Sequence, residues 1–294
     1  MLSGRLGLET ARVPHADRHG VIGLERGRLY VADGGLRFAT VGQPGGLKAG
    51  DYEIPFQQVS VILAGPGVAL THDALRLLAR HGTGFVAVGE GATRLYASMP
   101  FGPDDSALAR RQAALWADPK ERIRVALRMY DRRLGERLPQ RDLNAMRGIE
   151  GARAKAMYAR LAAQYGVEWR GRRYDRDEPE AADFANQAIN HAASAVSAAA
   201  MVAVATVGAI PQLGFIHEDS GMSFALDIAD LFRDSVVLPV AFACARDAHQ
   251  GHEEPIERRV RRSVATALRK GRVIPAMIDT IKELLGGNDG GDHA

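Results

Sequence analysis

The sequence contains a single cysteine, and this scarcity limits its chemistry. Cys244 lies in the apolar run VVLPVAFACARD of a 294-residue chain. One cysteine excludes an intramolecular disulfide. An apolar neighbourhood is typical of a small buried side chain and not of a nucleophilic thiol. We therefore expect Cys244 to be structural and the protein to be cytoplasmic, where thiols stay reduced.

Motifs for nucleotide binding are also missing. No GxxxxGK[ST] sequence occurs, so nothing indicates nucleotide hydrolysis. The segment GEGATR at 89–94 follows the strand-like FVAV, but it lacks the third glycine of a dinucleotide-binding loop. The next residues, RLYAS, continue as a strand instead of opening a helix. We interpret the segment as a hairpin turn.

Apolar runs of membrane-spanning length are scarce. Residues 1–30 carry charged side chains throughout, with no apolar core or cleavage site, so we expect no secretory signal. The stretch 191–210 approaches spanning length, but it is rich in alanine, contains hydroxyl side chains and lacks an aromatic belt. It predicts a closely packed core helix and no membrane attachment.

The overall composition is that of an ordinary soluble globular protein. Hydrophobic residues make up 46% and charged residues 25%, and the length suits one large domain or two of ordinary size. The net charge is only +3, so the position of the arginines carries more information than their excess. This balance permits a nucleic-acid partner without requiring one.

The first part of the chain predicts strands. Residues 21–98 consist of short alternating or β-branched runs separated by glycine, and Asp33-Gly34-Gly35 lies between two of them as a hairpin turn. One helix interrupts the pattern in THDALRLLARHG, where Thr71 is the expected N-cap and Gly82 the expected stop. We expect a β-rich, β-sandwich-like domain at 1–98.

The rest of the chain predicts helices. Residues 99–106 carry prolines, glycine and acids and predict a linker. Between 107 and 285 the apolar period lengthens to about 3.6 residues, the period of a helix with one buried face. Residues 286–294 predict a disordered tail. The predicted fold class is therefore α+β, with an all-helical domain after the β-rich one.

The helical half contains the strongest chemical signal, a set of acids and a histidine. Glu150 lies in RGIEGARAKAMY, and His217, Asp227 and Asp230 lie in GFIHEDSGMSFALDIADLF. Carboxylates three residues apart share a helix face, and carboxylates with a neutral imidazole suit Mg²⁺ or Mn²⁺. The apolar residues around both aspartates place them near a buried surface, where clustered carboxylates need a cation. The alternatives are surface or capping aspartates and a salt-bridged Glu150.

Two polar groups remain open to more than one interpretation. Asn186 and Asn190 lie four residues apart on a predicted helix, and they either hydrogen-bond the backbone or line the same cleft. The run IERRVRRSVATALRKGR at 256–272 is a basic strip, either a solvated face or a phosphate-binding surface. Its members include Arg258, Arg259 and Arg262.

A third polar group is an HxxH pattern formed by His249 and His252. The spacing alone would allow both histidines to bind a metal. The glycine and proline around them predict an exposed loop instead. We therefore interpret both as solvated histidines.

Long motifs in both halves carry a family resemblance. RGIEGARAKAMYARLAAQYGVEWRGRRYD at 147–175, the asparagine-bearing helix and GFIHEDSGMSFALDIADLF at 214–232 occur in this order. Together with PGVALTHDALRLLARHGTGFVAVGEGATRLYAS at 66–98, they resemble the CRISPR-associated integrase-endonuclease, the large subunit of the spacer-acquisition complex. The similarity is strongest to its subtype I-E branch.

The resemblance implies a catalytic helical domain and a metal-dependent reaction. In this family a divalent cation, here Mg²⁺ or Mn²⁺, would be held by the residues matching Glu150, His217 and Asp227, with Asp230 as a further catalytic acid nearby. The implied reaction joins protospacer 3′-hydroxyl ends to the repeat of the CRISPR array by transesterification. Because that exchange of phosphodiesters needs no ATP, it agrees with the missing nucleotide-binding motif.

The resemblance also implies partners. Family members form homodimers, two of which flank a dimer of a small ferredoxin-like CRISPR-associated protein in a heterohexamer, and the complex binds double-stranded protospacer and repeat DNA. We take the basic strip and the two asparagines as candidate DNA contacts, together with Arg94, Tyr174 and Arg233. Two rival hypotheses are a metal-dependent nuclease without integration activity and a non-catalytic DNA-binding scaffold.

The chain departs from the subtype I-E pattern at several positions expected to read DNA. An expected arginine is replaced near Val68 and Ala69, and an expected lysine is replaced near Ser220. An aromatic residue is replaced by Ser197 and a tryptophan by Pro179. These changes leave the metal chemistry untouched, but the details of protospacer-end and PAM recognition do not carry over.

Overall fold

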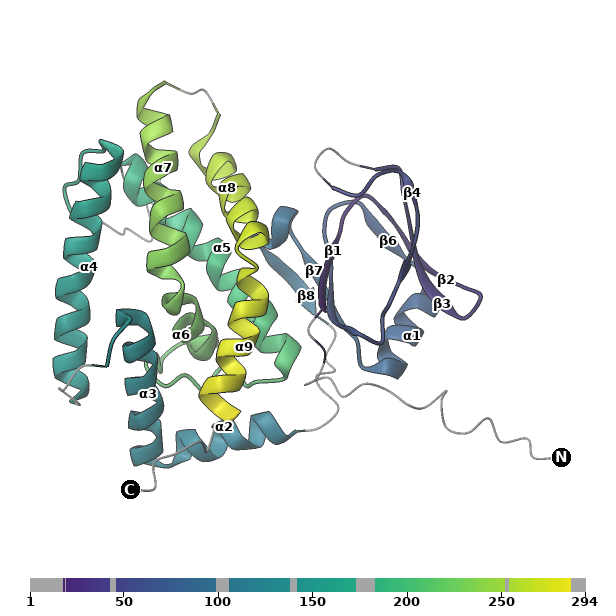
Figure 1. The fold of residues 1–294 in the computed structure, drawn as a ribbon, viewed down its shortest axis with the longest axis horizontal. Helices are drawn as coiled ribbons and strands as arrows, with labels where there is room; N and C mark the ends of the chain where they lie inside the picture. The colour runs from purple at the N-terminus through teal and green to yellow at the C-terminus, as the bar shows by residue number, and fades with distance from the viewer. Residues whose placement is uncertain are drawn as a thin grey trace.

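The computed structural model describes residue 18 and residues 20–42, 46–98, 106–137, 142–172, 183–251 and 254–286. Strands fill the first part of the chain and helices the second, and the two parts lie side by side (Figure 1). This arrangement confirms the predicted α+β class.

The strands are β1 Gly20–Leu24, β2 Gly27–Ala32, β3 Gly35–Thr40, β4 Gly50–Ile54, β5 Val59–Ala64, β6 Val68–Leu70, β7 Gly84–Val88 and β8 Leu95–Ser98. The helices are α1 His72–His81, α2 Ala107–Ala117, α3 Pro119–Leu134, α4 Leu143–Tyr165, α5 Phe184–Val207, α6 Ser223–Leu231, α7 Leu238–His249, α8 Ile256–Lys270 and α9 Val273–Gly286.

The strands form two sheets that share one apolar core. One sheet has the order β1-β5-β7-β8 and the other β4-β3-β2-β6. Leu24 and Ile62 from the first sheet, Phe38 from the second and Leu78 from α1 belong to the same buried cluster. The pairs β1–β5, β5–β7 and β2–β6 are parallel. The alternating pattern had predicted strands and hairpins, but it had not indicated these parallel pairings.

Strand β5 connects the two regions because it is buried along its whole length. Successive side chains of a strand point to opposite faces. Ile62 accordingly packs between the sheets, while Val61 and Leu63 join the core of the helical region. The first sheet is therefore covered on both faces, which explains why β5 is a continuous apolar run.

The local turn and cap predictions in the first region are confirmed. Asp33 and Gly34 join β2 to β3 with φ values of 52° and 76°, the conformation that a tight hairpin turn needs. The side chain of Thr71 accepts a hydrogen bond from the Ala74 N–H at the start of α1. Gly82 ends this helix in the left-handed conformation, with φ 63°.

The GEGATR segment is a hairpin turn, as predicted. Glu90–Ala92 forms a short 3-10 turn between the antiparallel strands β7 and β8. Gly91 packs so closely against α8 that an added Cβ would lie 2.0 Å from the Cβ of Ala265. Next to this contact, Arg94 Nη2 lies 2.5 Å from Glu257 Oε1 of α8. The turn therefore fixes the first region on the helical region.

Helix α5 is the centre of the helical region, and α6, α7, α8 and α9 all pack against it. Its many alanines let neighbouring helices approach closely, and most of its residues are buried. Among the described residues, one helix is long enough and apolar enough to cross a membrane, and that helix is α5. Its burial among other helices matches the predicted core helix at 191–210.

The remaining sequence predictions for this region have mixed outcomes. Cys244 is buried in α7, and burial raises the pKa of its thiol, in agreement with a structural role. His249 is exposed, as predicted, but it is the last residue of α7 and not part of a loop. His252 and the segment 287–294 lie outside the described residues, whereas Gly286 still belongs to α9.

Candidate metal and catalytic site

The site is built on α6 and on the loop that precedes it. A buried side chain of α2, Gln112, holds this loop by accepting a hydrogen bond from Ile210 N and donating to the carbonyl oxygens of Ile210 and Leu213, at 2.7 to 3.0 Å. Trp116 Nε1 donates to the carbonyl oxygen of Gly214 at 2.9 Å. Sequence reasoning missed both α2 residues because nothing local marks a side chain that bonds a loop about 100 residues away.

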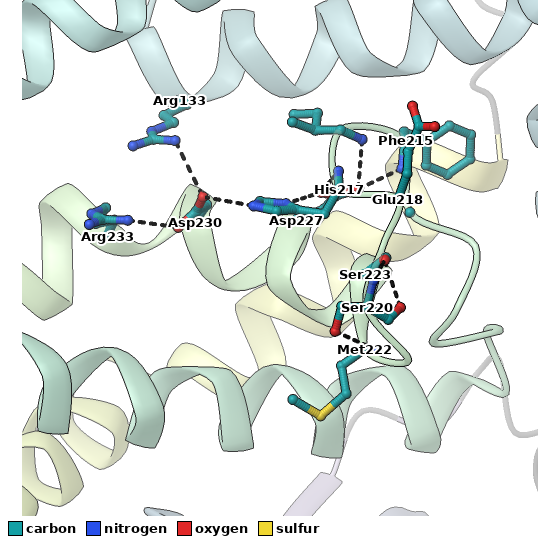
Figure 2. Close-up of polar contacts among 12 residues, drawn as sticks. Arg133, Phe215, His217, Glu218, Ser220, Met222, Ser223, Asp227, Asp230 and Arg233 are labelled. Carbon is teal, nitrogen blue, oxygen red and sulfur yellow. Dashed lines mark hydrogen bonds and ion pairs between the residues drawn. The ribbon is translucent and has the colours of Figure 1, made fainter. Parts of the chain in front are cut away.

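Asp227 is the buried anchor of the site, with 1% of its surface exposed. Its Oδ2 accepts hydrogen bonds from the backbone N–H groups of Phe215 and Ile216, at 2.6 and 3.1 Å. Its Oδ1 accepts from the backbone N–H of His217 at 3.0 Å and lies 2.7 Å from His217 Nδ1 (Figure 2). These four contacts occupy both carboxylate oxygens.

The contact with Asp227 sets the orientation of the His217 ring. A carboxylate only accepts, so Nδ1 carries the proton, and when the ring is neutral Nε2 presents its lone pair on the other side. Nε2 lies 4.0 Å from Asp230 Oδ2. The hydrogen bond to Asp227 raises the pKa of His217, burial opposes the shift, and the charges of the surrounding carboxylates add to it.

Asp230 is at the open end of the site, with 31% of its side chain exposed. Two guanidinium groups and the His217 ring face its carboxylate (Figure 2). Arg233 Nη1 is 3.2 Å from Oδ1, and Arg133 Nη1 and His217 Nε2 are 3.6 and 4.0 Å from Oδ2. A π-helical turn at Arg233–Val237 follows α6, a geometry that is frequent at functional sites.

Glu150 completes the arrangement from α4. Its Oε1 lies 2.6 Å from Arg133 Nη1, the atom that also faces Asp230. Glu150, His217, Asp227 and Asp230 all line one cavity of about 230 Å³ between α3, α4, α6 and the loop. The structure therefore brings together the four residues that the sequence singled out.

The donor set fits a hard divalent cation, although no group of three acidic or histidine side chains in the described residues is arranged closely enough to enclose one. The guanidinium of Arg133 lies between two of the carboxylates. Glu150, Asp230 and Nε2 of His217 face the cavity with groups that Mg²⁺ or Mn²⁺ accepts. Asp227 has no oxygen left for a metal, so the geometry disagrees with the predicted division of roles between Asp227 and Asp230.

The candidate DNA contacts fall into different environments. Arg94 and Asn190 line a groove of about 620 Å³ between β8, α5 and α8. Arg233 lies beside the cavity, where it donates to Asp230 Oδ1 at 3.2 Å and to Tyr158 Oη at 2.8 Å. Asn186 is fully buried and bonds the carbonyl oxygen of Gly171, which decides between its two interpretations in favour of a structural role. Tyr174 lies outside the described residues.

The basic strip of α8 is partly neutralised by acids. Glu254 lies within 4 Å of three of its arginines, and its closest contact is to Arg262 at 2.7 Å. Arg258 and Arg262 are largely solvent-exposed. Arg259 is buried, so its guanidinium is not on the surface where a duplex would bind. The strip therefore offers fewer free positive charges than its sequence indicates.

Comparisons with known proteins agree with the motifs. The model of the family described as CRISPR associated protein Cas1 matches residues 130–257. The CRISPR-associated endonuclease Cas1 2 of Thermus thermophilus is 39% identical over 234 residues, which are 79% of this chain and 71% of that protein. The CRISPR-associated endonuclease Cas1 of Escherichia coli K12 is 37% identical over 93% of this chain and 87% of its own length.

Solved structures extend the similarity to the fold. A crystal structure of a TtCas1–DNA complex matches with a TM-score of 0.81 at 36% identity, covering 91% of this chain and 96% of that one. A casposase bound to its integration product has a TM-score of 0.63 over 91% of this chain and 96% of its own, but at 14% identity it shows a shared fold alone. The sequence and fold together place this chain in the CRISPR-associated Cas1 family, in its subtype I-E-like branch.

Proposed function

We propose that this protein is a metal-dependent DNA endonuclease and integrase that joins protospacer 3′-hydroxyl ends to the CRISPR repeat by transesterification. The observation that supports this proposal most strongly is that the acids around one cavity have two different roles. A saturated, buried Asp227 fixes the His217 ring, while Glu150, Asp230 and His217 Nε2 face the cavity. In this proposal these last three residues hold the cation, and Asp227 is a positioning residue.

The chain's own groups suit chemistry at a phosphodiester. A bound Mg²⁺ or Mn²⁺ would supply Lewis-acid stabilisation of the charge that develops on the reacting phosphate. Arg133 and Arg233 add fixed positive charge beside Asp230, where phosphate oxygens would approach. The hydrogen bond from Nδ1 to Asp227 keeps the other ring nitrogen of His217 available as a ligand.

The surface next to Glu150 supports DNA access. Gly148 and Gly151 lie on either side of Glu150 in α4, although glycine inside a helix is destabilising by about 0.5–1 kcal/mol relative to alanine. An added Cβ at either glycine would meet no atom of the described residues within 4 Å. Internal packing does not explain these glycines, and in this proposal they allow a DNA backbone to approach the site closely.

The proposed assembly follows from the family. One relative, TtCas1, has been crystallised with DNA. We extend that partner to this chain as double-stranded protospacer and repeat DNA, with Arg94, Asn190 and the exposed arginines of α8 as contacts. A homodimer, a heterohexamer with the small ferredoxin-like partner and a cytoplasmic location belong to the same proposal.

The experiment that tests the function is a DNA-joining assay. A labelled protospacer duplex with 3′-hydroxyl ends and a supercoiled repeat-bearing plasmid are mixed with the protein, with and without the small partner, in Mg²⁺, Mn²⁺ or EDTA. Joining that requires metal and is lost in Asp230→Asn would support the proposal. The matched control is Asp219→Asn, because Asp219 is an exposed residue of the same loop.

The same assay separates the two rivals. Metal-dependent cutting without joining, across correct ends and targets, would leave a nuclease. DNA binding without cutting or joining would leave a scaffold. Joining that persists in EDTA would contradict every metal-based interpretation.

A further inference from the structure

Arg133 is a charged residue of the site that the family motifs do not contain. It lies in the last turn of α3, and only 11% of its side chain is exposed. Its Nη1 is 2.6 Å from Glu150 Oε1 and 3.6 Å from Asp230 Oδ2. One guanidinium nitrogen therefore contacts two of the three side chains that we assign to the metal.

The position of this nitrogen matters because Asp230 Oδ2 is the oxygen that also faces His217 Nε2, at 4.0 Å. Arg133 thus reaches into the space between the proposed ligands, and Figure 2 shows its side chain pointing toward Asp230. Two partly buried carboxylates that lie close together are costly when no positive charge pairs with them. The guanidinium supplies the counter-charge that the acids need.

The geometry points to Arg133 as an internal counter-ion that competes with the divalent cation: its guanidinium must leave Glu150 and Asp230 for the metal to bind. This inference rests on the proposed metal site. A guanidinium and a divalent cation repel each other strongly at the few ångströms that separate these groups. The two cannot share the same carboxylate oxygens, so each weakens the binding of the other by the same factor.

Arg133 is not the sole positive group facing these acids. Arg233 contacts Asp230 Oδ1, the oxygen turned away from Arg133, and Arg147 lines the cavity and hydrogen-bonds Tyr130. Among the described residues, neither of them forms an ion pair with Glu150. Removing Arg133 therefore leaves Asp230 paired with Arg233, takes away the ion pair of Glu150 with Arg133, and clears the space between the two acids.

The test is Mn²⁺ binding measured by calorimetry and by thermal shift in wild type, Arg133→Met and a matched control. The control is Arg132→Met, because Arg132 is the neighbouring residue and pairs with exposed Glu283 at 2.5 Å, away from the cavity. We expect Arg133→Met to melt at a lower temperature in EDTA and to bind Mn²⁺ about tenfold more tightly than wild type. Arg132→Met should bind Mn²⁺ like wild type. A merely structural role for Arg133 would lower stability without raising metal affinity.

The outcomes separate this inference from the proposed function. If wild type binds Mn²⁺, Asp230→Asn does not, and Arg133→Met binds no more tightly than wild type, the counter-ion role is overturned and the metal site stands. If wild type and Asp230→Asn bind Mn²⁺ equally, the proposed metal site fails and the inference fails with it.

A second measurement does not depend on the folding of Arg133→Met. In wild-type protein labelled with ¹⁵N-arginine, Mg²⁺ should change the guanidinium signal of one restrained arginine, and Arg133→Lys assigns that signal by removing it. A guanidinium signal of Arg133 that is unchanged at saturating Mg²⁺ would show that the ion pair with Glu150 persists, and this too would overturn the inference.

Discussion

Asp227 and Asp230 lie three residues apart on α6, but the two ends of the site that they occupy are organised differently. At the buried end, Asp227 makes all its contacts with the loop that it closes. At the open end, Asp230 is shared among Arg133, Arg233 and His217 at longer distances, from 3.2 to 4.0 Å. Saturated short contacts fix a geometry, whereas several longer contacts with polar and charged groups allow partners to be exchanged. The metal site that we propose requires both properties.

The largest effect that we expect from this difference is a loss of stability in Asp227→Ala. The change leaves three backbone N–H groups without an acceptor, one buried and two part-buried, and each buried unsatisfied group costs about 1–3 kcal/mol. We expect the free energy of unfolding to fall by about 3 kcal/mol or more, measured by urea denaturation. Asp219→Ala, on the exposed part of the same loop, should stay within about 0.5 kcal/mol of wild type.

A wild-type denaturation midpoint for Asp227→Ala would show that the buried end is not a structural anchor. The family motif implies that both aspartates are catalytic, which by itself gives no reason to expect a loss of stability. The hydrogen bonds of Asp227 change that expectation.

Asp230→Asn should show the reverse pattern. Loss of a charged metal ligand forfeits several kcal/mol of transition-state stabilisation, so DNA joining should fall by about 100-fold or more. Its unfolding free energy should change by about 1 kcal/mol or less, because the partly exposed carboxylate closes no loop. Rates from the joining assay and urea curves on the same preparation test both parts. Equal activity in Asp230→Asn and wild type would remove Asp230 from the proposed ligand set.

Metal should stabilise the wild-type protein through the open end alone. A ligand at 100 times its dissociation constant adds about 2.7 kcal/mol to the stability of the folded state. We expect Mn²⁺ to raise the melting temperature of wild type and to leave that of Asp230→Asn unchanged, as measured by calorimetry in matched ionic strength. An equal rise in both proteins would place the metal elsewhere.

The smallest expected effects are those of Gly151→Ala, which separates folding from DNA access. This change should stabilise α4 by about 0.5–1 kcal/mol, since position 151 is exposed and helical. If the DNA backbone approaches this surface, the added methyl group should lower the affinity for protospacer DNA and the joining rate. Fluorescence anisotropy with labelled DNA measures the first quantity. Increased stability with unchanged DNA affinity and joining would show that no DNA passes close to Gly151.

Local chemistry explains what could be predicted from the sequence. Asp33-Gly34 and the two caps of α1 depend on residues within four positions of each other, and the structure forms them as expected. The four site residues were recognised because their motifs are contiguous. The fold class followed from a change of apolar period that extends over the whole chain.

What the sequence could not predict depends on distant contacts. The parallel pairing of β1 with β5 joins residues about 40 positions apart, and no residue pattern in either strand specifies the partner. The roles of Asp227 and Asp230 depend on which of them meets the returning loop at 215–217. Arg133 reaches Glu150 only because α3 packs on α4, so its place between two acids has no signature in the sequence.

The network around Asp227 also has a consequence for how the protein fails. The same four contacts that close the loop orient the imidazole, so local opening of this loop and loss of the His217 ligand are one event. A chain that is damaged or only partly folded here therefore has no correctly oriented ligand set with which to hold a cation. For a protein that we propose cuts and joins DNA, this coupling would leave copies that are unfolded at this loop without activity.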